Sequence, residues 1–142
     1  MIQVENNIAL TFEDFKTEVI NAYKIAIISR ECSLLGRREV LTDGKEVPQL
    51  AMAKAFKNGD FRSGYYRDQT FMMAIGEMTI QQFFAGLYGH ADIEHDPMSG
   101  GRQMGGHFAT HSLNEDGSWK DLTQQKNSSS DISPTAGQMP RL

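Results

Sequence analysis

Three short segments of this chain carry side chains that can bind an anion. Tyr65, Tyr66 and Arg67 form an aromatic-basic cluster, residues 99–107 are rich in glycine, and a Ser-Pro-Thr sequence at 133–135 can begin a helix. Arginine presents a planar fork of donors that matches phosphate oxygens, tyrosine adds a hydroxyl donor, and a helix N-terminus exposes unpaired amides. Together, the three segments could hold a diphosphate group.

Each segment also has an ordinary structural interpretation. A Tyr-Arg pair at a strand end usually belongs to a surface ion pair, and a Ser-Pro sequence usually only caps a helix. The glycine-rich segment fits neither the dinucleotide fingerprint nor the phosphate-binding loop, because its glycines have other offsets and no Lys-Ser/Thr pair follows. Its glycines allow a ligand to approach the backbone closely. Arg102 and His107 are its candidates for electrostatic stabilisation or proton transfer.

The longest predicted helix begins at Thr11 and continues to about Leu35. Thr11 and Asp14 form a capping-box-like pair, and Gly36 can end the helix in a left-handed conformation. Apolar residues at helical spacing predict its buried face: Phe12, Phe15, Val19, Ala22, Tyr23 and Ala26.

Three shorter helices are predicted before residue 90. They run from near Pro48 to a stop at Asn58-Gly59, from Gln69 to Ile75, and from a Thr79 cap to Tyr88. The last is expected to bury Ile80, Phe83, Phe84, Leu87 and Tyr88. Residues 60–68, which contain the Tyr-Arg cluster, suit a short strand or an extended loop.

The second half of the chain has little periodicity. Residues 90–132 are rich in Gly, Ser, Asp, Asn and His, and they predict a long loop that is either disordered or functional. Residues 133–142 predict the start of another helix. Helical character is therefore expected for residues 11–89, and the loop and the final helix start are expected to follow.

Composition limits the class of protein. The 142 residues carry a net charge of −4, without a segment that concentrates Lys and Arg, so that nucleic acid and an anionic membrane surface are not expected partners. There is one cysteine, Cys32, and no run of about 18 apolar residues. We expect a cytoplasmic protein.

Four motifs in order resemble a known family. They are GYYRDQTFMMAIG at residues 64–76, FFAGLYG at 83–89, GGRQMGGH at 100–107 and ISPTAGQMP at 132–140. Their order and spacing over residues 30–142 are similar to those of the α-type half of thiamine-diphosphate-dependent 2-oxo acid dehydrogenases, the decarboxylating component, especially the branched-chain-like branch. The four motifs in order are more specific than any one of them.

The resemblance implies a fold and residue roles. The fold would be the α/β thiamine-diphosphate-binding fold, with residues 1–142 an incomplete N-terminal part that is mostly α-helical, with short strands and a long polar loop. Tyr66 and Arg67 would contact the cofactor diphosphate, flanked by Tyr65. His107 would stand beside the reactive thiazolium as the proton-transfer residue, and Ser133 and Thr135 would line the cofactor pocket.

The resemblance also implies a reaction and partners. The enzyme would oxidatively decarboxylate a 2-oxo acid, pyruvate-like or branched-chain, and pass the acyl group to a lipoyl acyltransferase component. Mg²⁺ would be bound by a Gly-Asp-Gly motif and an asparagine that this chain lacks, and Glu115-Asp116-Gly117 is a false lookalike inside the polar loop. A β-type half, as a separate subunit or a fused C-terminal part, would complete the site, and this chain alone is expected to be inactive.

Two other functions remain open. A metal-binding module is suggested by four histidines and three acidic residues in one loop: His90, His95, His107, His111, Asp92, Glu94 and Asp96. Structural zinc sites usually add cysteines, and the glycines oppose the helix that would bring His107 and His111 to one face. The other alternative is a helical interaction module without catalysis that docks through the faces of Phe12 and Phe83.

Overall fold

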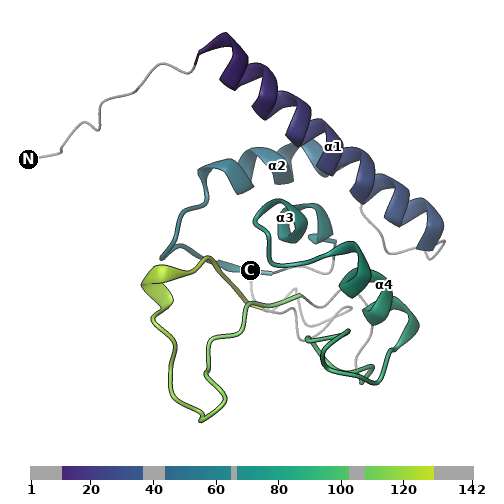
Figure 1. Ribbon diagram of the computed structural model, residues 1–142, viewed down its shortest axis with the longest axis vertical. Helices are drawn as coiled ribbons and strands as arrows, with labels where there is room; N and C mark the ends of the chain where they lie inside the picture. The colour runs from purple at the N-terminus through teal and green to yellow at the C-terminus, as the bar shows by residue number, and fades with distance from the viewer. Residues whose placement is uncertain (1–10, 37–43, 65–66, 103–107, 130–142) are drawn as a thin grey trace, which may run out of the picture.

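The computed structural model describes residues 11–36, 44–64, 67–102 and 108–129 (Figure 1). It is mostly helical, with one small parallel sheet. In chain order, the elements are α1 (Phe12–Gly36), α2 (Glu46–Ala55), β1 (Phe61–Ser63), α3 (Gln69–Ala74), α4 (Ile80–Tyr88), the 3-10 helix η1 (Leu122–Gln124) and β2 (Asn127–Ser129). No helix in these ranges is long and apolar enough to cross a membrane.

The predicted boundaries of α1 are confirmed, but its predicted buried face is wrong. Thr11 caps the helix, since its Oγ1 accepts a hydrogen bond from the Asp14 amide at 3.2 Å. Phe12 and Tyr23 are 74% and 65% exposed, and the large apolar residues of the first half lie mainly on the surface. The buried residues of α1 are Ser29 and Cys32 in its second half. Small side chains allow close packing there, whereas large apolar residues occur on most sides of this helix.

The second helix starts and ends earlier than predicted. It begins at Glu46, two residues before Pro48, and ends at Ala55, after which Phe56 is extended. Glu46 is buried in the first turn, and its carboxylate lies 3.6 Å from the guanidinium of Arg30 on α1. An acidic residue is favourable at this end of a helix because the first-turn amides carry partial positive charge.

The next two helices match their predictions. α3 closes at Gly76, which has a φ of +85°. α4 has the predicted capping box between Thr79 and Gln82, and Gly89 ends it in the left-handed conformation. Its buried face is narrower than expected: Phe83 is buried and Phe84 and Leu87 are half-buried, whereas Ile80 and Tyr88 are 41% and 78% exposed.

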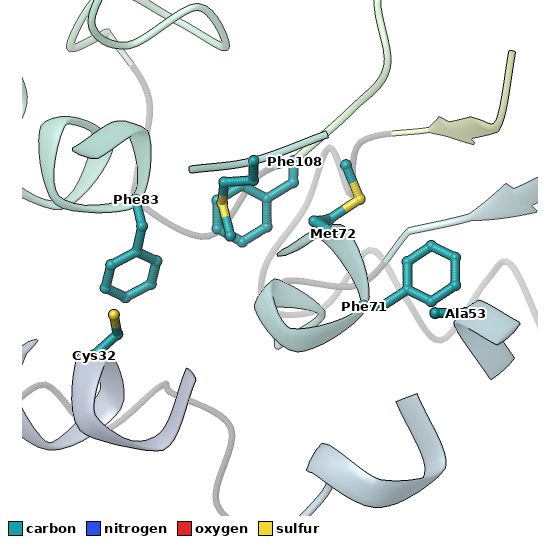
Figure 2. Close-up of a cluster of buried hydrophobic side chains, with 7 residues drawn as sticks. Cys32, Ala53, Phe71, Met72, Phe83 and Phe108 are labelled. Atoms are coloured by element: carbon teal, nitrogen blue, oxygen red, sulfur yellow. The ribbon is translucent and has the colours of Figure 1, made fainter. Parts of the chain in front are cut away.

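The core lies where α1, α2, α3 and α4 meet, and it includes two residues outside the helices, Met78 and Phe108. Its buried members are Cys32, Ala53, Phe71, Met72, Met78, Phe83 and Phe108. Figure 2 shows Phe83 of α4 pointing toward Cys32 of α1, and Phe71 of α3 pointing toward Ala53 of α2. The Phe71 ring also meets the ring of Phe56 edge-on, with centroids 5.2 Å apart. Because Phe108 follows the glycine-rich segment directly, the core anchors one end of that segment.

The two strands pair in parallel, with Phe61, Arg62 and Ser63 opposite Asn127, Ser128 and Ser129. Residues 90–132, where a long functional or disordered loop was predicted, thus contain β2. They also contain η1 and a bridge between Leu113 and Trp119. The Asn-Ser-Ser sequence of β2 has no apolar alternation, so the usual signal of a strand is missing. The helix predicted at 133–142 lies outside the described residues.

Candidate functional site

Of the six residues predicted to contact or act on the cofactor, Arg67 lies within the described residues. Arg67 is half-buried and lies between β1 and α3. Tyr65, Tyr66, His107, Ser133 and Thr135 lie outside the described residues, so their predicted roles rest on the chain that flanks them.

The parallel pairing places the carboxyl ends of β1 and β2, Ser63 and Ser129, side by side at one edge of the sheet. In the sequence, Tyr65, Tyr66 and Arg67 follow β1, and the Ser-Pro-Thr sequence at 133–135 follows β2. Ligands of open α/β sheets characteristically bind at this edge.

Gly64 marks the point of closest approach between the two strand ends. Its amide donates to the carbonyl oxygen of Ser129 at 3.0 Å. A Cβ atom at this position would lie 2.1 Å from the same oxygen, a distance that no side chain tolerates. Glycine is thus required where the chain enters the Tyr-Arg cluster.

The third segment is attached to the same sheet. Thr110, just beyond the glycine-rich segment, donates its amide to the Ser128 carbonyl at 3.0 Å, and its Oγ1 accepts the Ser128 amide at 3.0 Å. Phe108 is buried in the core. The chain after the glycine-rich segment therefore packs beside β2, the strand that pairs with β1.

Arg62, which lies shortly before the Tyr-Arg cluster in the sequence, forms an ion pair inside the protein. The guanidinium of Arg62 donates to the carboxylate of Asp68 and lies over the ring of Phe71, 4.0 Å from its centroid. Both side chains of this ion pair are only 12% exposed. The charge of Arg62 is therefore neutralised inside the protein, and we assign it a structural role.

The beginning of the glycine-rich segment is built around a buried carboxylate. Asp96 accepts hydrogen bonds from the Ser99 hydroxyl at 2.8 Å and the Gly101 amide at 3.0 Å. A Cβ atom on Gly101 would lie 2.5 Å from the carbonyl oxygen of Gly89. The absence of a side chain at Gly101 thus allows the backbone at Gly89 to lie close to it, whereas the sequence analysis suggested close approach of a ligand. Arg102 is exposed and donates to the Ser99 carbonyl at 3.3 Å.

The histidines of this region do not form a metal centre with the other described residues. The rings of His90 and His95 lie 4.6 Å apart, and His95 contacts Asp92 at 3.1 Å. No group of three His, Cys, Asp or Glu side chains able to hold a metal ion occurs within 11–36, 44–64, 67–102 and 108–129. His107, which the metal-binding alternative also uses, lies outside those ranges.

The Glu115-Asp116-Gly117 sequence forms a local turn. The Asp116 carboxylate accepts hydrogen bonds from the Ser118 amide at 2.9 Å and the Ser118 hydroxyl at 2.6 Å. These bonds lower the pKa of Asp116 below its ordinary value. The carboxylate is engaged in this local turn.

Comparison with known proteins identifies the class. A family model described as the dehydrogenase E1 component matches residues 25–118, and the chain belongs to that family. The family consists of thiamine-diphosphate-dependent enzymes that work within multienzyme complexes, so membership implies a thiamine-diphosphate-binding fold. The matched range includes Arg67 and the glycine-rich segment and stops before Ser133 and Thr135. Comparison with curated proteins and with solved structures found no match.

Proposed function

We propose that this chain forms one side of the cofactor site of an enzyme that oxidatively decarboxylates a 2-oxo acid. The observation that carries the proposal is the parallel pairing of β1 with β2. The carboxyl ends of both strands lie at one edge. The Tyr-Arg cluster follows β1 in the sequence, the chain toward 133–135 follows β2, and Thr110 is hydrogen-bonded to Ser128 of β2.

The available donors fit a diphosphate. Arg67 is half-buried between β1 and α3 in the chain, and a guanidinium can bind phosphate oxygens with two parallel hydrogen bonds. Tyr66, flanked by Tyr65, would add a hydroxyl donor, and Ser133 and Thr135 would line the pocket. Mg²⁺ would be bound by the Gly-Asp-Gly motif and the asparagine that the residues of this chain do not include.

The protein side of the reaction is positioning and proton transfer. Thiamine diphosphate supplies the electron sink that allows carbon dioxide to leave a 2-oxo acid. Arg67 would hold the diphosphate electrostatically, and His107 would transfer protons near the reacting carbon. The acyl group would then pass to the lipoyl group of an acyltransferase component.

The exposed face of α1 supports a requirement for a partner half. Large apolar side chains recur along this helix and are exposed: Phe12, Phe15, Val19, Ile20, Tyr23, Ile27, Ile28, Leu34 and Leu35. Large apolar side chains exposed in such numbers along one helix commonly mark an interaction site. The other face suggested for docking, that of Phe83, is unavailable because Phe83 is only 3% exposed in the core.

The test is isothermal titration of thiamine diphosphate with Mg²⁺ into the complete assembly that contains this chain. Arg67→Ala is expected to weaken binding about 10- to 100-fold, because it removes charge-assisted hydrogen bonds. Arg67→Lys should give an intermediate loss, since lysine keeps the charge without the planar fork. Lys16→Ala is the control: it removes one positive charge from an exposed ion pair on α1. Unchanged affinity in Arg67→Ala would refute the diphosphate role.

A non-catalytic interaction module is the second candidate, favoured by the same α1 face. It predicts that the chain binds a partner through α1 while the assembly shows no affinity for thiamine diphosphate. The same titration therefore separates the two functions.

A further inference from the structure

The side-chain amide of Gln49 on α2 is hydrogen-bonded to the backbone at both ends of the turn that follows Arg67. Gln49 is buried, and its Nε2 donates to the carbonyl oxygen of Arg67 at 2.9 Å. Its Oε1 accepts the backbone amide of Phe71 at 2.9 Å. The two backbone groups lie on either side of Asp68, so that a single amide ties the end of the Tyr-Arg cluster to the first turn of α3.

The Phe71 amide belongs to the first turn of α3, where backbone N–H groups have no partner within the helix. The residue before a helix commonly accepts such a bond with its own side chain. Here that residue is Asp68, which makes no side-chain capping bond, because its carboxylate holds Arg62. Gln49 supplies the capping acceptor from another helix.

The two hydrogen bonds of Gln49 restrict the backbone of Arg67. The hydrogen bond to its carbonyl fixes the peptide plane that follows it, because the peptide group is rigid. The bond to the Phe71 amide fixes the next turn of chain. Arg67 is thus held from its C-terminal side, and on its N-terminal side the chain is fixed at Gly64, through the hydrogen bond to Ser129.

We propose that Gln49 is a positioning residue for Arg67. The inference rests on the proposed function, in which Arg67 binds the cofactor diphosphate. By fixing the backbone of Arg67 before the ligand arrives, Gln49 removes part of the ordering cost that binding would otherwise carry. Gln49 itself contacts backbone groups of the protein and is not assigned a contact with the cofactor.

The first test compares Gln49→Met with Ser29→Ala in the complete assembly. Methionine has a similar length but can neither donate to Arg67 nor accept from Phe71. We expect a roughly five- to tenfold rise in the Kd of thiamine diphosphate with Mg²⁺, measured by titration calorimetry. Ser29→Ala removes a different buried hydrogen bond to α3, between Ser29 Oγ and Thr70 Oγ1 at 2.6 Å. It should lower the thermal midpoint and leave this Kd unchanged.

A double-mutant cycle decides whether Gln49 acts through Arg67. If it does, adding Gln49→Met to Arg67→Ala should weaken binding little beyond Arg67→Ala alone. Full additivity would overturn the inference, as would an unchanged Kd in Gln49→Met while Arg67→Ala binds weakly. If Arg67→Ala itself has no effect on the Kd, the proposed diphosphate role of Arg67 is refuted. That outcome is distinct from one in which only the positioning role of Gln49 is refuted.

A second variant covers the case in which Gln49→Met does not fold. Gln49→Glu keeps the shape and an acceptor for the Phe71 amide, but an ionised carboxylate cannot donate to the Arg67 carbonyl. The same rise in Kd is expected at neutral pH. A Kd equal to that of the unmodified assembly would overturn the role of this hydrogen bond.

Discussion

Gly64 and Ser129 meet backbone to backbone at the ends of two parallel strands, although they are 65 residues apart in the chain. The Gly64 amide donates to the Ser129 carbonyl at 3.0 Å, and the Ser129 hydroxyl accepts from the same amide at 3.3 Å. This contact fixes the distance between the segments that we assign to the cofactor.

Gly64→Ala should therefore disrupt the strand ends. The new methyl group would meet a backbone oxygen that cannot rotate away, and we expect a loss of about 1 to 3 kcal/mol in unfolding free energy. Urea denaturation of the full chain measures it. Gly86→Ala is the matched control, because its methyl group would meet the nearest neighbour at an ordinary 3.7 Å. If both variants are equally stable, the close approach is not a constraint.

Asn127→Ala should loosen the start of the same sheet. The Asn127 side chain is almost fully buried, and its Nδ2 donates to the carbonyl oxygens of Leu122 at 2.8 Å, Gln125 at 3.1 Å and Asp60 at 3.2 Å. Removing one donor group that serves three carbonyls should cost about 2 to 3 kcal/mol. Hydrogen exchange at residues 60–64 should accelerate. The exposed Asn114→Ala should change it little, and similar exchange in both variants would argue against this role.

Asp68→Ala should be more destabilising than loss of an exposed carboxylate. It leaves the guanidinium of Arg62 largely buried without its ion-pair partner, which typically costs about 3 to 5 kcal/mol. Glu13→Ala, which breaks an exposed ion pair with Lys16, should cost less than about 0.5 kcal/mol. The double variant Arg62→Met with Asp68→Leu should recover much of the loss, as measured by thermal denaturation. A double variant no more stable than Asp68→Ala would show that the ion pair itself is required.

Cys32 should react slowly with iodoacetamide while the chain is folded. Burial, together with the neighbouring Glu31 carboxylate, raises the pKa of the Cys32 thiol. A raised pKa means less thiolate at any given pH, so the alkylation rate near pH 8 should be low and should continue to rise at higher pH. Mass spectrometry in buffer and in denaturant compares the two states, and Cys32 is the only cysteine. Equal rates in both would contradict the buried position.

Local signals explain which parts of the fold could be predicted from sequence. The ends of α1 and α4 were predictable because their caps involve residues three positions apart, such as Thr79 and Gln82. The buried side of α1 was not, because apolar residues occur on most sides of that helix. β2 was missed because its polar residues are stabilised by partners far away in sequence, including Asp60 and Thr110.

The same distinction applies to the candidate site. Arg67 was identified because of the types and order of its neighbours in the sequence. Gln49 was not, because its function depends on a contact across 18 positions of the chain and on Asp68 being engaged elsewhere. A glutamine in a helix is otherwise an ordinary polar residue.

The long separation between the paired strands also determines when this region can form. The helices before residue 90 can associate through nearby contacts, but β1 has no partner until β2 has been synthesised, 65 residues later than Gly64. Closing so long a loop costs conformational entropy, which is offset only when the contacts between β1 and β2 form. Among the elements in the described residues, the β1–β2 pair is therefore the last that can form during synthesis, and a nascent chain that stops before Asn127 leaves β1 without this partner strand.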